Sequence, residues 1–122
     1  MVLTVEDLDI YKMAEDLADK VWNICIGWDY FTRDTIGKQL VRAADSISAN
    51  LAEGHGRYHF KDRLNFCYYA RGSLEETKSW ISKTMRRGLI SPEENEIRRI
   101  TEILPKQLNA YIASIKKANR KL

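Results

Sequence analysis

One short segment carries side chains of the kinds that bind metal ions. Glu53, His55 and His59 supply oxygen and nitrogen donors that could in principle coordinate zinc. Gly54 and Gly56 interrupt this segment, so we do not expect the two histidines to share one helix face, and ordinary loop histidines are the better interpretation. The sequence therefore predicts no metal site and no cofactor.

The two cysteines are the other candidates for chemistry, because a thiolate can act as a nucleophile. Neither Cys25 nor Cys67 has a histidine nearby in the sequence, and both lie among apolar helix positions, which predicts buried free thiols. The acidic pairs Glu75–Glu76 and Glu93–Glu94 fit a helix surface and a capping turn, and no glycine-rich phosphate loop is present. We therefore predict a protein that is not an enzyme, and an enzyme with a site assembled between subunits is the least favoured alternative.

Basic residues are distributed unevenly along the chain. Residues 1–60 carry 6 Lys+Arg against 10 Asp+Glu, a difference of −4, whereas residues 61–122 carry 14 against 7, a difference of +7. An anionic partner is therefore expected to contact the second half. The candidate nucleic-acid contacts are Arg57, Lys61, Arg63, Lys116, Lys117, Arg120 and Lys121. For each of them alone a solvated surface charge is the simpler interpretation, since helix C-termini attract Lys and Arg.

These side chains must be positioned by helices, because apolar residues recur at helical spacing and no strand-like alternation is present. The pattern predicts four helices in one domain spanning residues 1–122, at approximately 7–26, 35–53, 60–87 and 92–118. Gly54 and Gly88 are expected to end the second and third helices. Ser91 and Pro92 are expected to begin the fourth, and Pro105 to bend it.

Four helices with short connectors favour an antiparallel, up-and-down four-helix bundle. In that arrangement the connector after the second helix and the end of the fourth lie at the same end. Ser46, Asn50 and Glu53 form a small and polar stripe on the second helix, and we expect Asn50 and Glu53 to take part in a buried polar network. The third helix has two apolar stripes, which suggests a central place in the bundle or a contact between subunits.

The chain also lacks the features of a membrane or exported protein. No stretch approaches the roughly 20 apolar residues of a membrane span, and the first residues carry acids where a signal peptide has bases. We therefore expect a cytoplasmic protein that does not contact a membrane.

Three blocks of the sequence resemble the small bacterial four-helix-bundle proteins encoded within intervening sequences of 23S rRNA genes. They are Gln39–Ile47, Asn50–Gly54 and Ala70–Glu76, and the resemblance spans nearly the whole chain. This chain has Ser48 and Leu51 where the family often has proline and isoleucine.

The resemblance implies an antiparallel four-helix bundle assembled as a homopentameric ring, similar also to the accessory protein of diversity-generating retroelements. That relative binds nucleic acid and works with a reverse transcriptase, so the implied partners are RNA or DNA, a nucleic-acid-processing protein and copies of the chain itself. The matched motif residues are carried over as structural or assembly positions only: Ser46, Asn50, Glu53, Gly54, Arg71 and Ser73.

The favoured interpretation is a non-enzymatic, oligomeric helical module that acts as a nucleic-acid-associated accessory or scaffold protein through basic surface residues. The alternative is a protein-protein interaction scaffold without nucleic-acid affinity. Phosphate binding that weakens as salt rises would separate the two.

Overall fold

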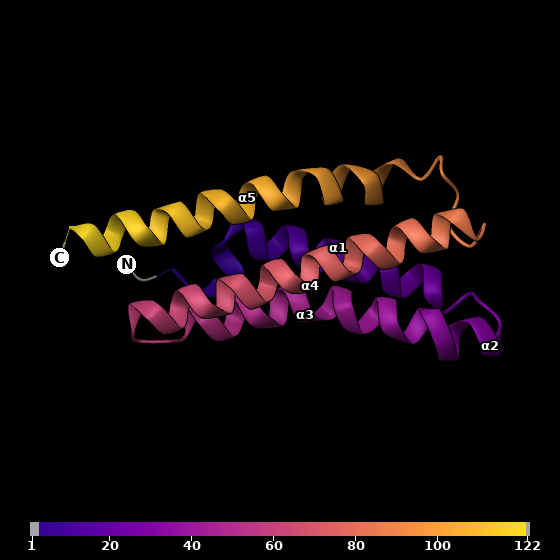
Figure 1. The fold of residues 1–122 in the computed structure, drawn as a ribbon, viewed down its shortest axis with the longest axis horizontal. Coiled ribbons are helices and arrows are strands. Elements are labelled where there is room, and N and C mark those ends of the chain that lie inside the picture. The colour runs from indigo at the N-terminus through magenta and orange to yellow at the C-terminus, as the bar shows by residue number, and fades with distance from the viewer. Residues whose placement is uncertain (1–2, 122) are drawn as a thin grey trace.

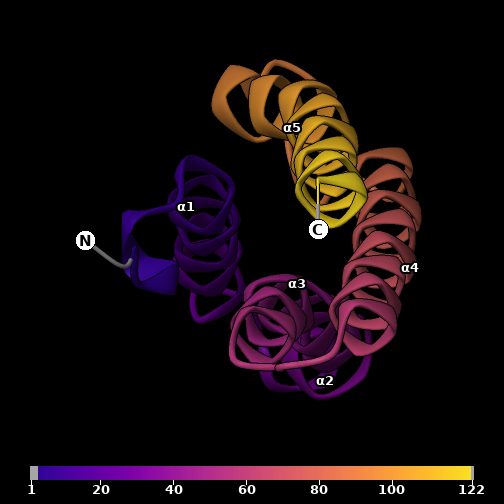
Figure 2. The same ribbon diagram turned by 90° about the vertical axis from the view of Figure 1, so that its left-hand side faces the viewer.

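The computed structural model describes residues 3–121, in which four long helices pack side by side around one core. These helices are α1 (Asp9–Cys25), α3 (Lys38–His55), α4 (Phe60–Arg86) and α5 (Asn95–Arg120). Successive long helices run in opposite directions, and they surround the core in chain order (Figures 1 and 2). The predicted all-α four-helix bundle is confirmed.

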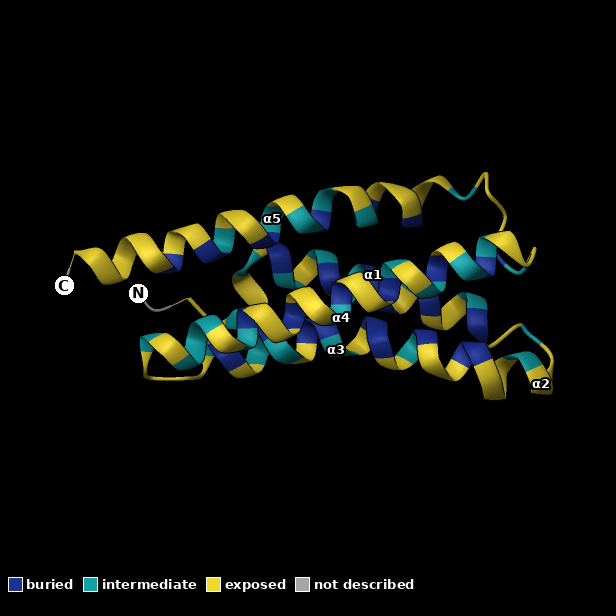
Figure 3. Cartoon of the chain, in the orientation of Figure 1, coloured by how far each residue is buried: buried dark blue, intermediate teal, exposed yellow. Residues whose placement is uncertain are grey.

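The core consists of one apolar stripe from each long helix, as the helical spacing predicts. Figure 3 shows this buried face turned inward along all four helices. Its largest fully buried aliphatic side chains are Leu17, Val21, Leu40, Ile47, Leu51, Leu74, Ile97, Ile100, Leu104 and Leu108. Residues of the second stripe of α4 are also buried within the single chain, namely Ala70, Thr77 and Thr84. No helix among the described residues has the length and apolar character that crossing a membrane requires.

The first helix starts later than predicted. Val5–Asp7 form a separate 3₁₀ turn, and α1 begins at Asp9. The Asp7 carboxylate accepts hydrogen bonds from the backbone N–H of Thr4 at 2.9 Å and from its hydroxyl at 3.0 Å. These bonds close the turn, while Leu8, in an extended conformation, separates it from the helix.

The second long helix starts earlier than the predicted residue 35. A helical turn, α2 (Tyr30–Thr32), and a π-helix, η2 (Arg33–Gly37), lead directly into α3. The Asp29 carboxylate caps this start by accepting a 2.8 Å hydrogen bond from the backbone N–H of Thr32. Residues 30–34, predicted to lie between the first two helices, are therefore helical because an aspartate N-cap precedes them.

The prediction that Gly54 ends α3 is wrong. The helix continues to His55, and Gly56 is the C-cap. A Cβ atom on Gly54 would lie only 2.7 Å from the Cβ of Phe66 in α4. The glycine therefore permits close approach of two helices rather than a turn. Gly88 does end the third long helix as predicted, with a left-handed φ of 75°.

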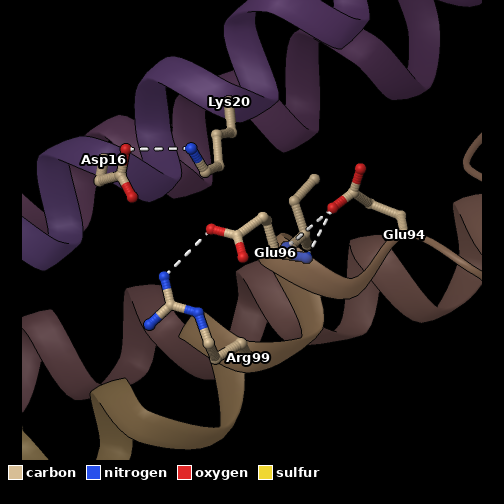
Figure 4. Close-up of polar contacts among 6 residues, drawn as sticks. Asp16, Lys20, Glu94, Glu96 and Arg99 are labelled. Carbon is tan, nitrogen blue, oxygen red and sulfur yellow. Dashed lines mark hydrogen bonds and ion pairs between the residues drawn. The ribbon is translucent and has the colours of Figure 1, made fainter.

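The start of α5 was also predicted incorrectly. The Ser91 hydroxyl accepts a hydrogen bond from the backbone N–H of Glu93 within a turn, and the helix begins at Asn95 instead of residue 92. Glu94 is the N-cap, and its carboxylate accepts bonds from the N–H groups of Glu96 at 2.8 Å and Ile97 at 3.2 Å (Figure 4). The helix then continues through Pro105 without a break.

Candidate nucleic-acid interface

One end of the bundle gathers the predicted basic residues, as the antiparallel topology requires. The α3–α4 connector and the end of α5 lie together there, near both termini (Figure 1). The last buried residue of α5 is Ile115. Beyond it four exposed cations make no ion pair with any described residue, and we call them the cationic tail: Lys116, Lys117, Arg120 and Lys121. Figure 3 shows this segment exposed beyond the rest of the bundle.

The connector contributes two further cations of different character. Arg57 is exposed, but its Nη2 lies 2.6 Å from Glu53 Oε1 and its guanidinium lies 4.9 Å from the centre of the Phe66 ring. Lys61 is exposed and has no ion pair with the described residues. Glu53 lies on the surface in this pair, so its predicted place in a buried network is wrong.

Arg63 differs from the other predicted contacts because it is half-buried. Its Nε is buried without a hydrogen-bond partner among the described residues, and its charge lies close enough to Tyr111 to affect that hydroxyl. Burial raises the pKa of Tyr111, and Arg63 opposes this shift. Arg63 is thus less accessible to a phosphate than Lys61 or the cationic tail.

The residues considered for a metal site have other partners. His55 Nε2 lies 2.9 Å from the Leu3 carbonyl oxygen and its Nδ1 lies 3.4 Å from the Tyr111 hydroxyl. His59 packs edge-to-face against Tyr58. Within residues 3–121, no group of three His, Cys, Asp or Glu side chains is arranged to hold a metal ion.

The cysteines are buried free thiols, as predicted. Burial raises the pKa of the Cys25 thiol to about 11 and also raises the pKa of Cys67. Because the thiolate is the nucleophilic form, burial makes both residues unreactive near neutral pH.

A polar seam between α3 and α4 includes three of the motif residues. The hydroxyl oxygens of Ser46 and Ser73 lie 2.8 Å apart, and Asn50 Nδ2 donates to the Ser46 carbonyl oxygen at 2.9 Å and to its hydroxyl at 3.1 Å. The predicted polar network of Asn50 is confirmed. The bonds to Ser46 satisfy the half-buried Asn50 amide within α3, whereas the Ser46–Ser73 bond and a 3.4 Å contact from Asn50 Nδ2 to the Ser73 hydroxyl join α3 to α4.

Arg71 connects α4 with α5. Its Nη2 donates a 2.6 Å hydrogen bond to Asn109 Oδ1, and its guanidinium lies 5.6 Å from the centre of the Tyr68 ring. Glu75, four residues further along α4, pairs instead with Lys78 at 3.6 Å. Arg71 thus links the exposed surfaces of α4 and α5.

The carboxylates of Glu15, Asp19 and Asp45 lie close together where α1 meets α3. The buried Ser48 donates a 3.0 Å hydrogen bond to Glu15. The pKa of Asp45 is raised by burial first and then by repulsion from Glu15 and Asp19. The immediate surroundings of these three carboxylates are therefore unfavourable for a polyanion.

A second candidate surface lies at the end of the bundle away from the cationic tail, and sequence reasoning did not identify it. An open, mainly apolar groove of about 460 Å³ runs between the end of α1 and the α2–α3 segment, and we call it the aromatic groove. It is lined by Trp22, Cys25, Ile26, Tyr30, Arg33, Asp34, Gly37, Lys38, Val41 and Arg42. The sequence signal that could have found it is the i, i+3, i+4 spacing of Trp22, Cys25 and Ile26, which places them on one face of a helix.

The fold and these surfaces define a small helical-bundle protein with exposed basic and aromatic surfaces and buried, unreactive thiols. Comparison with known families identifies it further: the chain belongs to the 23S rRNA-intervening sequence protein family, whose family model matches residues 6–110.

A crystal structure of a protein of unknown function from the S23 ribosomal protein family of Bacteroides thetaiotaomicron has the same fold. The TM-score is 0.75 at 22% sequence identity, and the alignment covers 84% of this chain and 97% of the other. The curated proteins contain no match to this chain.

Proposed function

We propose that this protein is a non-enzymatic, nucleic-acid-associated accessory protein of the cytoplasm that works as a homopentameric ring. The observation that carries the nucleic-acid role is the cationic tail, whose four charges are exposed and unpaired among residues 3–121. Lys61, in the first turn of α4, lies at the end of the bundle where α4 begins and adds to this charge.

Phosphate recognition suits such a surface because it needs mobile cations and no fixed geometry. One tail of four cations makes only a few weak contacts. A ring would present several tails to one polyanion, and multivalent binding strengthens weak contacts without creating new ones. The membership in a family named for 23S rRNA intervening sequences is consistent with RNA as the polyanion.

Self-association is supported by large apolar side chains that the single chain leaves exposed. Tyr58 and Tyr69, near the α3–α4 end of the bundle, are exposed by 92% and 56%. Tyr68, which lies beside Tyr69 on α4, is also exposed. Contacts between copies would bury such residues, and a head-to-tail contact that closes after five copies produces the proposed ring.

The test combines light scattering with binding measurements on a structured RNA and a duplex DNA over a salt titration. We expect a pentamer, and binding whose logarithm falls linearly with the logarithm of salt concentration, by roughly 0.9 per phosphate contact on duplex DNA. Reversing the charges of the cationic tail to glutamate should weaken binding and flatten this slope.

The matched control is Lys106→Glu, which changes one exposed charge on the same helix outside the tail. Absence of binding at low salt would overturn the nucleic-acid role and leave the alternative, a protein-protein interaction scaffold. Unchanged affinity after reversal of all four tail charges would show that the tail is not the contact surface.

A further inference from the structure

The aromatic groove has walls that a flat ring could stack against. Trp22 on α1 and Tyr30 on α2 both line it, and their side chains are 54% and 74% exposed. Ile26 and Val41 supply further apolar surface. Because these rings and aliphatic side chains form one contiguous apolar lining, the groove can accept a planar or apolar group.

Three cations surround these rings. Arg33, Lys38 and Arg42 line the groove, and none of them makes an ion pair within residues 3–121. Among the described residues that line it Asp34 is the only acid, so the groove carries a local excess of positive charge. Aromatic faces together with uncommitted cations match a ligand that has both a planar ring and negative charge.

We propose that the aromatic groove binds single-stranded nucleic acid, with an unstacked base against Trp22 and Tyr30 and the neighbouring phosphates on Arg33, Lys38 and Arg42. This inference rests on the proposed function and adds to it a second contact surface and a preference for single strands. Base stacking on aromatic side chains accepts any base, because every base has a π-face. A base within a duplex is stacked and paired, so a duplex cannot offer that face to the groove.

The groove, with its preference for single strands, and the cationic tail lie at opposite ends of the bundle. The groove lies at the α2 end, whereas the cationic tail lies near the C-terminus (Figure 1). The tail recognises charge alone and accepts single or double strands. The groove requires an exposed base, so the two ends of one bundle bind different parts of an RNA that has both helical and single-stranded segments.

The test measures the binding of a fluorescein-labelled twelve-nucleotide oligo(dT) by anisotropy and of unlabelled thymidine monophosphate by tryptophan fluorescence. Both ligands should quench the fluorescence of the intact chain, and Trp22→Phe should remove most of that response although two other tryptophans remain. Tyr30→Ala should weaken oligo(dT) binding about five-fold to 150-fold, the range that the loss of one base-aromatic stack produces.

The matched control is Phe31→Ala. Phe31 is the next residue in α2 and is equally exposed at 74%, but it does not line the groove. Equal effects of Tyr30→Ala and Phe31→Ala would overturn the proposal. It would also be overturned if Tyr30→Ala changed the oligomeric state and left oligo(dT) binding intact, because the occupant would then be a second copy of the chain.

The two ligands and the tail variant separate this proposal from the function on which it rests. Quenching by the monophosphate supports a groove that accepts a free nucleotide, and quenching by oligo(dT) alone supports one that requires a strand. Loss of structured-RNA binding in the tail variant, with no groove response to either ligand, overturns the groove and keeps the proposed function. A groove response without any structured-RNA binding would keep the groove and overturn the role of the cationic tail in the proposed function.

Discussion

Replacing Gly54 by alanine adds one methyl group at the closest approach of α3 and α4. The new Cβ would lie 2.7 Å from the Cβ of Phe66 and 3.4 Å from the Arg63 carbonyl oxygen. Neither neighbour can turn away, because a Cβ and a carbonyl oxygen are fixed by the backbone. One helix must therefore shift, and the polar seam of Ser46, Asn50 and Ser73 between the same helices shifts with it.

Gly72 provides the comparison that isolates this contact. It also lies inside a long helix, and a Cβ there would meet nothing within 4 Å. Alanine is favoured over glycine in a helix by up to about 1 kcal/mol, so Gly72→Ala should stabilise the protein by up to that amount. Gly54→Ala receives the same gain but incurs an overpacking cost of about 1–3 kcal/mol. The two variants should therefore differ in stability by roughly 1–3 kcal/mol.

Urea unfolding followed by circular dichroism measures this difference. All three proteins must be compared at one protein concentration, because self-association would make the midpoint depend on concentration. We expect the midpoint to rise for Gly72→Ala and to fall for Gly54→Ala, with similar urea dependence of the unfolding free energy. If Gly54→Ala proved as stable as Gly72→Ala, the close contact between α3 and α4 would not exist as described.

Two further predictions concern the charged groups described above. Asp45→Asn should stabilise the protein at neutral pH and leave its stability unchanged near pH 3, as measured by urea unfolding at several pH values. A carboxyl whose folded pKa is raised binds protons more tightly in the folded state than in the unfolded state. Its destabilising effect therefore grows as pH rises from the unfolded pKa through the folded pKa. Glu94→Ala should lower thermal stability by the equivalent of about 1 kcal/mol, since it removes the N-cap of α5, whereas Ser91→Ala should change it little; equal losses would contradict the observed cap.

Apolar periodicity was sufficient to predict the four-helix bundle, but it could not fix where the helices begin. Ser91 and Pro92 form a reasonable helix start by local chemistry, yet Glu94 supplies the cap in the structure. The two options satisfy different backbone N–H groups, that of Glu93 for Ser91 and those of Glu96 and Ile97 for Glu94, and the choice depends on where α5 must meet the core. Gly88 was predicted correctly because its role is local, in a left-handed turn.

The candidate surfaces could likewise be predicted only where local sequence determines them, and not where tertiary contacts do. The cationic tail follows from sequence, because four of the six residues 116–121 are Lys or Arg. Tertiary contacts decide that Arg63 is half-buried and that Arg71 bonds to Asn109, and no local pattern carries this information. The aromatic groove was missed because Trp22 lies at helical spacing with buried residues although half of its own surface is exposed.

The π-helical segment Arg33–Gly37 also has a consequence for helical phase. Each residue of an α-helix advances the chain by about 100°, and a π-turn contains one residue more than an α-turn. The residues before η2 are therefore offset by about one residue from the phase that α3 alone would set. That offset determines which way Tyr30 faces. A one-residue deletion within η2 would therefore rotate Tyr30 away from the aromatic groove while preserving the apolar stripe of α3.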